Sequence, residues 1–328
     1  MSRNLVVTYG EGQTGHLIID LLLSDENFSK AVKSLHVMTC NPEHEYIKEL
    51  DGNEKASVIA CTPGDVDAMS KSLKDSGADT ILLIPPAVDK KLEAVKEMVE
   101  ATKKAGIANM VLLSSAGADM AERDKQQKLR EFVDIEVEVM KSKEDTTTAA
   151  GHCPCLIRAG FYAENLLLYN KYAQDKAKLP LPMGAAHKIS PVALRDIALL
   201  VAHVVTSTGE HGLGDKVRGQ LITMTGPTMA TGIELAEAAA QGLGTKLDYE
   251  EITENDANKL LEGAEISEAE KQYILEYYSL ARESKTNYIS THAFHDITGQ
   301  VPTSISDFFK SHASEFKPKK RRTSKTSI

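Results

Sequence analysis

Apolar and polar positions alternate in a regular way along the first 160 residues. Six short apolar runs are separated by longer stretches in which apolar residues recur at helical spacing, as Leu92, Val95 and Val99 do. Continuous apolar runs are typical of buried parallel strands, and strands separated by helices indicate βαβ units. We expect strands at Leu5–Thr8, Leu35–Thr39, Ser57–Cys61, Thr80–Ile84, Met110–Ser114 and Cys155–Arg158. The pattern predicts an α/β fold, a Rossmann doubly wound parallel sheet, over residues 1–160.

The regular alternation ends after Gly160. A helical pattern covers Phe161–Lys178, and we expect short strands at Ile189–Val192, Leu221–Thr225 and Leu247–Ile252. Further helices are expected at Ala193–Val205, Gly232–Gly242, Glu254–Leu261, Ser267–Arg282 and Ser304–His312. We expect residues 161–316 to form a smaller α/β C-terminal subdomain, interleaved with the core, that covers the cleft as a lid and receives a substrate or partner. Residues 317–328 are polar and basic, which predicts a disordered tail.

A glycine-rich turn follows the first strand and precedes a helical pattern. Gly10, Gly12 and Gly15 have the G-x-G-x-x-G spacing of a dinucleotide-binding turn. Glycines let the pyrophosphate approach the amides of the helix N-terminus, where the helix dipole favours negative charge. The turn therefore predicts NAD(P) binding, whereas the alternative is a turn that binds nothing. The expected contacts are Gly10, Glu11, Gly12, Gln13, Thr14 and Gly15.

Several residues at the ends of the next strands are candidates for contact with a dinucleotide. The second strand ends without the acid that selects NAD or the arginine that accepts NADP, so the preference between them stays open. Asn41 either bonds a ribose hydroxyl or begins the following helix as its cap. Asp65 either reaches an adenine edge or caps the next helix. Ile84, Pro85 and Pro86 end the fourth strand beside the expected cofactor.

The residues that would carry catalysis are harder to assign. Ser114 ends the fifth strand, where a serine either faces the substrate in short-chain dehydrogenase-like folds or bonds backbone groups. No tyrosine lies between Tyr46 and Tyr162, so this segment lacks the Tyr-x-x-x-Lys motif with its general acid. Catalytic residues are therefore left unassigned. Tyr162, Tyr169 and His187 join Ser114 as candidate pocket residues, and the two tyrosines suit packing under the lid equally well.

Charge and composition narrow the possible partners. The 328-residue chain has a net charge of −9, and residues 317–325 carry six positive charges, which leaves −15 for the rest. An acidic body repels phosphate, so direct nucleic-acid binding by the folded part is disfavoured. The basic tail either directs nuclear import or is a solubilising end. The longest apolar run is too short for a membrane helix, and a first strand at about Asn4 leaves no room for a signal or transit peptide.

The four cysteines indicate a reducing compartment, and none has the spacing of a metal site, so we expect no metal. These observations predict a cytoplasmic protein, or a nuclear one if the tail acts as an import signal.

Taken together, these segments make the chain similar to a known family, the NmrA-like group of atypical short-chain dehydrogenase/reductases. The resemblance extends to about Lys317, and its most specific part is Arg158-Ala159-Gly160-Phe161-Tyr162-Ala163-Glu164-Asn165. Other matching segments are Gly12-x-x-Gly15, Thr39-x-Asn41-Pro42, Gly64-Asp65, Glu144 seven residues before Gly151, Ser190-Pro191-Val192, Arg195-Asp196-Ile197-Ala198 and Ser284-Lys285-Thr286. The resemblance implies a Rossmann core, a bound NAD(P) and cofactor contacts from Tyr162 through Asn165.

Three residues depart from the pattern of that group, and all three bear on the cofactor or the reaction. Tyr9 stands where the group usually has glycine. Cys40 stands where members that use NADPH have arginine, which weakens a preference for NADP. Met140 aligns with the lysine or histidine that faces the nicotinamide in several members.

Two hypotheses follow for the function. In the first, the chain is a redox-sensing regulator that binds NAD(P), has weak or no turnover and changes its affinity for a protein partner with the state of the cofactor. In the second, it is an NAD(P)H-dependent reductase of a quinone-like or conjugated small molecule, since the cofactor itself carries the hydride chemistry.

Overall fold

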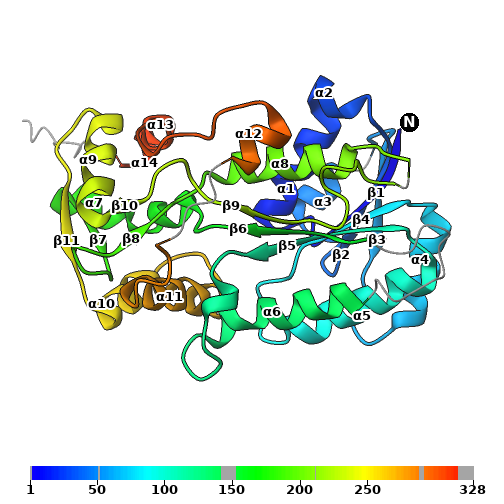
Figure 1. The fold of residues 1–328 in the computed structure, drawn as a ribbon, viewed down its shortest axis with the longest axis horizontal. Helices are drawn as coiled ribbons and strands as arrows, with labels where there is room; N and C mark the ends of the chain where they lie inside the picture. Colours follow the sequence, from blue (N-terminus) through cyan, green and yellow to red (C-terminus); the bar gives the residue numbers. More distant parts are fainter. Residues whose placement is uncertain (1, 51, 142–152, 211, 288–291, 317–328) are drawn as a thin grey trace, which may run out of the picture.

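Seven parallel strands form the central sheet, in the order β3-β2-β1-β4-β5-β6-β9 (Figure 1). The computed structural model describes residues 2–50, 52–141, 153–210, 212–287 and 292–316. The strands are β1 (Arg3–Thr8), β2 (Val32–Thr39), β3 (Ala56–Ala60), β4 (Thr80–Leu83), β5 (Asn109–Ser115), β6 (Cys155–Ala159) and β9 (Leu221–Met224). The six strands expected from the sequence are confirmed. Strand order reverses between β1 and β4, the switch point at which ligands bind in such sheets.

The seventh strand comes from the second half of the chain. Leu221–Thr225 was expected within the C-terminal part that is interleaved with the core, and β9 pairs in parallel with β6. Ile222 and Met224 are buried in the same hydrophobic cluster as the residues of β1 and β5. The second half of the chain therefore contributes a strand to the Rossmann sheet.

Two layers of helices cover the sheet (Figure 1). One face carries α4 (Val66–Ser76), α5 (Lys91–Ala105) and α6 (Gln127–Met140). The other carries α1 (Gln13–Ser24), α2 (Glu26–Ser29), α3 (Glu45–Glu49), α8 (Leu194–Thr206) and α12 (Ala293–Thr298). Parallel strands covered on both faces must be apolar on both faces, which is why they appear in the sequence as continuous apolar runs. Among the described helices, none combines the length and apolar character that a bilayer crossing needs.

The C-terminal elements, together with one short helix that follows β5, pack around a separate hydrophobic cluster beyond one end of the sheet (Figure 1). They are η1 (Ala118–Met120), η3 (Ala163–Tyr169), α7 (Asn170–Lys176), β7 (Lys178–Leu181), β8 (Lys188–Ile189), β10 (Ala230–Thr231), α9 (Gly232–Leu243), β11 (Asp248–Glu251), α10 (Glu254–Leu261), α11 (Glu268–Arg282), α13 (Ile305–Ser311) and α14 (Ala313–Phe316). Two small sheets, β10–β8 and β11–β7, hold these helices together.

Two expectations for this part were wrong in detail. The helix expected over Phe161–Lys178 is divided into η3 and α7, because Tyr162 pairs with Val192 as an isolated bridge and delays the start of the helix. The strand expected at Ile189–Val192 ends at Ile189. Pro191 has no N–H to continue the ladder, which accounts for the early end.

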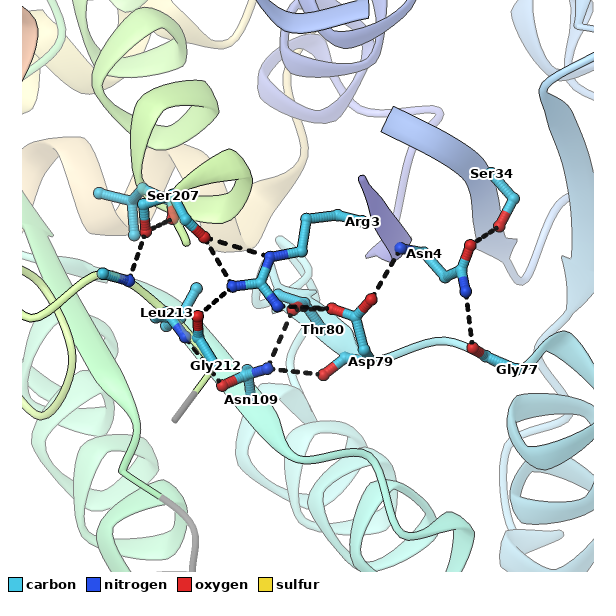
Figure 2. A network of polar contacts seen from close by, with 12 residues as sticks. Arg3, Asn4, Ser34, Gly77, Asp79, Thr80, Asn109, Ser207, Gly212 and Leu213 are labelled. Carbon is cyan, nitrogen blue, oxygen red and sulfur yellow. Dashed lines mark hydrogen bonds and ion pairs between the residues drawn. The ribbon is translucent and has the colours of Figure 1, made fainter. Parts of the chain in front are cut away.

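A buried polar network ties the amino ends of the strands to the loop that follows α8 (Figure 2). Arg3 donates to the carbonyls of Ser207, at 3.1 and 2.6 Å, and of Gly212, and forms an ion pair with Asp79 at 3.2 Å. Asn109 donates to the carbonyl of Asp79 at 2.9 Å. The network lies at the opposite ends of the strands from the glycine-rich turn, so its role is to hold the fold together.

Candidate functional site

The glycine-rich turn connects the end of β1 to α1. Tyr9 has a left-handed backbone, with φ of 51°, a conformation that glycine adopts more easily. Gly10 and Gly15 are required by close packing, since a Cβ atom would lie 2.2 Å from Val37 Cγ1 at Gly10 and 2.6 Å from the Tyr9 carbonyl oxygen at Gly15. The sequence motif therefore forms a tight turn in which Tyr9 accepts the strain that a glycine would avoid.

Gly12 differs from the other two glycines because it faces open space. A Cβ atom there would approach only the Tyr9 carbonyl oxygen, at 3.5 Å, which is an ordinary contact. Gly12 also caps α1 without a side-chain hydrogen bond, and Gln13, the first residue of the helix, is exposed. The first amides of α1 are thus accessible to an anion, and the absence of a side chain at Gly12 leaves room for it.

The ends of β2 and β3 border the turn on one side. The Cys40 thiol donates to the Tyr9 hydroxyl at 3.9 Å, and Cys40 and Asn41 are exposed. Asn41 does not cap the following helix, because α3 begins at Glu45 after a turn in which the His44 amide bonds the Asn41 carbonyl. The expectation that Asn41 starts that helix was wrong, and its side chain remains exposed beside the turn.

Asp65 does have the capping role that the sequence allowed. Its carboxylate accepts a hydrogen bond from the Ala68 amide at 2.9 Å at the start of α4, and the side chain is exposed. One carboxylate oxygen engaged in a cap leaves acceptor capacity for a second donor. The reach to an adenine edge stays a prediction.

The end of β4 is fixed to β1 and to α11. The Ile84 amide donates to the Thr8 hydroxyl at 2.9 Å, which aligns the ends of the two strands at the switch point. Pro85 and Pro86 then carry the chain away from the sheet, and Ser267, the N-cap of α11, donates to the Ala87 carbonyl at 2.9 Å. These contacts place the first turn of α11 over the carboxyl ends of the strands.

Ser114 is turned away from this cleft. Its hydroxyl donates to Glu136 of α6 at 2.6 Å, and Glu136 is paired with Arg158 through two contacts of 2.8 and 2.7 Å. Arg158 also pairs with Asp119 at 2.8 Å. Both Ser114 and Glu136 are buried, so this cluster holds β5, β6 and α6 together, and the pocket role of Ser114 stays a prediction.

Ser115 is the serine that faces the C-terminal subdomain. Its hydroxyl lies 2.8 Å from that of Tyr273 in α11, within hydrogen-bonding distance. Burial and the nearby Glu270 raise the pKa of Tyr273 to about 12, although the bond to Ser115 opposes the shift. Tyr273 therefore stays protonated through the neutral range. Neither residue was a candidate in the sequence, because they are separated by 158 positions and form no motif.

Tyr162 lies near the glycine-rich turn. Its side chain is hydrogen-bonded to that of Thr14, in the first turn of α1. Burial and the proximity of Tyr273 raise its pKa far above the ordinary value. Tyr162 thus lies near both Thr14, at the start of α1, and Tyr273 of α11.

The alignment of Met140 with the lysine or histidine of several family members stays a prediction. Met140 is at the last turn of α6 and lines a groove of about 450 Å³ with Leu156 and Leu221, at the amino ends of β6 and β9. The acid that pairs with Arg158 is Glu136, whereas Glu144 lies outside the described residues.

Phe132 of α6 packs against the C-terminal hydrophobic cluster. The Phe132 ring contacts that of Tyr273, with centroids 5.9 Å apart.

The other sequence candidates lie elsewhere or bond within their own loop. Tyr169 is buried in the C-terminal cluster. His187 accepts a hydrogen bond from the Gly184 amide at 2.9 Å. The backbone amide of Asn165 donates to the Tyr162 carbonyl, which keeps Asn165 close to Tyr162. Glu164 caps α8, because its carboxylate accepts a hydrogen bond from the Leu194 amide at 3.0 Å. In the segment from Arg158 to Asn165, two residues therefore stabilise the fold: Arg158 through its ion pairs and Glu164 as a helix cap.

Lys91 is a buried cation beside these aromatic rings, and it gives a prediction for pH dependence. Its ammonium lies 4.2 Å from the centre of the Phe132 ring and 3.8 Å from Glu131. Burial lowers the pKa of Lys91 to about 8, which Glu131 only partly offsets. Because the folded-state pKa lies below the unfolded one, the unfolded state binds more protons between these values, and stability rises with pH.

We expect the free energy of unfolding to gain about 2 kcal/mol from this residue between pH 7 and about pH 9.5. Urea unfolding of the wild type and Lys91→Met at both pH values measures the contribution. The advantage of the variant over the wild type is expected to shrink as the pH rises, and an advantage that grows with pH would contradict the assignment.

Comparisons with known proteins agree with the Rossmann fold described above. The model of the NmrA-like family matches residues 1–325. An NAD(P)H azoreductase of Xenophilus azovorans is 25% identical over 242 residues, which are 73% of this chain and 77% of the relative. The crystal structure of an NADPH-dependent quinone oxidoreductase of Escherichia coli with NADPH is 20% identical, has a TM-score of 0.76, and is matched over 94% of this chain and 99% of that one.

The structure of NmrA, a negative transcriptional regulator, in complex with NADP is 12% identical, with a TM-score of 0.71, over 94% of this chain and 95% of that one. The family model spans almost the whole sequence, and the chain belongs to the NmrA-like family.

Proposed function

We propose that the chain binds a nicotinamide dinucleotide across the carboxyl ends of β1, β4 and β5. The observation that supports this proposal is the shape of the glycine-rich turn. Gly10 and Gly15 are closely packed, whereas the space beside Gly12 is open to a pyrophosphate. The pyrophosphate would be held by the amides at the start of α1, and the adenosine half would extend toward Asn41 and Asp65. The azoreductase and the quinone oxidoreductase, both similar to this chain, are named for their use of NAD(P)H or NADPH.

We further propose that the protein is a reductase of a quinone-like or conjugated acceptor. The hydroxyl pair of Ser115 and Tyr273 carries this proposal. When bound, the dinucleotide supplies a hydride. The chain must then provide a proton to the acceptor oxygen or nitrogen, and Tyr273 is a protonated hydroxyl at the end of β5 that can donate it. Ser115 holds the tyrosine hydroxyl in place.

The redox-sensing regulator remains the second candidate. It is favoured by the similarity to NmrA, a negative transcriptional regulator. In this case the dinucleotide would alter the affinity for a regulatory protein partner. A cytoplasmic location, with nuclear entry directed by residues 317–325, would suit this role, and that tail lies outside the described residues.

Steady-state oxidation of NADH and NADPH with a panel of quinones and azo dyes tests the proposal. We expect turnover with at least one acceptor at a rate that rises in proportion to protein concentration. A protein that binds the dinucleotide but turns over no acceptor would contradict the reductase and leave the regulator.

A further inference from the structure

Two cysteines lie next to each other at the ends of β2 and β3. The last paired residues of these parallel strands are Thr39 and Ala60, and the Cys61 amide continues the ladder by bonding the Thr39 carbonyl at 2.7 Å. Cys40 and Cys61 follow these residues and are therefore neighbours across the strands. Neighbouring strands lie about 4.8 Å apart, which is within the roughly 4.4–6.8 Å that Cα atoms span across a disulfide.

The two thiols lie close to each other. The Cys40 thiol is near enough to raise the pKa of the Cys61 thiol, and both cysteines are free. Cys40 is exposed and Cys61 is half-buried, with its sulfur 3.7 Å from that of Met69. Cys40 also bonds the Tyr9 hydroxyl, so the pair adjoins the glycine-rich turn. An exposed thiol beside a second thiol is the arrangement that oxidation converts to a disulfide.

We propose that Cys40 and Cys61 form a reversible disulfide when the protein meets a peroxide. The Cys40 sulfur attacks one peroxide oxygen, the O–O bond breaks, and a sulfenic acid and one water are formed. The Cys61 sulfur then attacks the Cys40 sulfur, the S–O bond breaks, and a second water leaves. The two thiols lose two electrons and two protons, and one hydrogen peroxide is reduced to two waters.

The charges around the pair determine how its reaction depends on pH. Burial, the nearby Cys40 thiol, and the carboxylates of Glu97 and Glu11 raise the pKa of the Cys61 thiol. The thiolate is the nucleophile, so the second step is slow at neutral pH and accelerates as the pH rises toward the raised pKa. Tyr9, the other titratable group in contact with Cys40, has a pKa raised by burial and by both thiols and stays protonated in this range.

The position of the pair connects its oxidation to the cofactor, a step that rests on the proposed function. The adenosine half of a dinucleotide would cover the end of β2, where Cys40 is exposed. Bound NADH is therefore expected to protect the thiols and to slow disulfide formation several-fold. In turn, the disulfide removes the thiol hydrogen that Cys40 donates to Tyr9 and releases the Tyr9 ring beside the turn.

The test is peptide mapping by mass spectrometry after treatment of the full chain with hydrogen peroxide, with and without later reduction. We expect a linked pair of peptides that contain Cys40 and Cys61, less two hydrogens, which disappears on reduction and forms faster at pH 9 than at pH 7. Cys40→Ser and Cys61→Ser should abolish the linkage, whereas Cys153→Ser should leave it unchanged. Cys153 and Cys155 serve as the control pair. They are also free cysteines and are close in sequence, with one residue between them, but Cys155 is buried.

The absence of a Cys40–Cys61 linkage, or a dominant linkage through Cys153, would overturn the proposal. A second arm repeats the oxidation with saturating NADH. If the linkage forms but NADH gives no protection, the disulfide stands and the placement of the adenosine half fails, so the two results can be distinguished.

Discussion

Replacement of Tyr273 by Phe is expected to lower kcat for acceptor reduction by about 10²- to 10³-fold, the usual contribution of a positioned proton donor. The ring keeps its contact with Phe132, at 5.9 Å between centroids, and only the hydroxyl bonded to Ser115 is lost. Dinucleotide affinity should change little, because the expected pyrophosphate contacts are made by the start of α1. Steady-state kinetics with an acceptor from the quinone panel, together with NADH titration, separates the two effects.

Two further variants distinguish proton donation from packing. Tyr277→Phe removes a hydroxyl one turn later on the same helix, where the ring packs 5.1 Å from that of Phe161, and should leave kcat within about threefold. Ser115→Ala removes the hydroxyl that positions Tyr273, and we expect a smaller loss than with Tyr273→Phe. Equal rates for Tyr273→Phe and the wild type across pH 6–9 would contradict the role of the tyrosine.

Replacement of Arg3 by Ala is expected to lower the free energy of unfolding by about 3–5 kcal/mol. The side chain is buried, and it satisfies the carbonyls of Ser207 and Gly212 while it pairs with Asp79 (Figure 2). Its removal leaves Asp79 without its cation and the Ser207 carbonyl without the donor that Arg3 supplies. The Gly212 carbonyl still accepts from the Gly209 amide at 2.9 Å, and the Asn4 amide still donates to Asp79 at 2.9 Å. Urea unfolding followed by circular dichroism measures the loss.

Arg123→Ala is the matched control for Arg3→Ala. Arg123 makes two contacts with Asp134, at 2.7 and 2.5 Å, but its side chain is 67% exposed. Solvent screens an exposed pair, so its loss should be much smaller than that for Arg3. Similar losses for the two variants would show that the network in Figure 2 does not contribute as a buried unit.

The strands and most helices could be predicted from the sequence because their signals are local. Apolar runs located the strands that surround the switch point, and Asp65 was recognised as a cap because its partner, Ala68, is three residues away. Asn41 failed as a cap for an equally local reason. Pro42 is followed by a turn, and α3 begins only at Glu45.

The acceptor side of the site could not be predicted in the same way. Ser114 and Ser115 are adjacent, and the alternation of side chains along a strand gives them opposite faces, but the sequence does not say which face meets α11. Tyr273 comes from a helix that reaches β5 only through tertiary packing, helped by Glu276, which accepts from the Leu129 amide at 2.9 Å. Phe132 was missed because its contact with Tyr273 also depends on tertiary packing.

Titration calorimetry with NADH and NADPH, on the wild type and Gly12→Ala, tests most directly the claim that this turn binds a dinucleotide. A Cβ atom at Gly12 meets only the Tyr9 carbonyl oxygen, at 3.5 Å, so the variant should unfold within about 1 kcal/mol of the wild type. We predict binding to the wild type with a Kd in roughly the micromolar range and a loss of at least about tenfold in the variant. No heat with either nucleotide from the folded wild type, or equal affinities for the two proteins, would contradict the account.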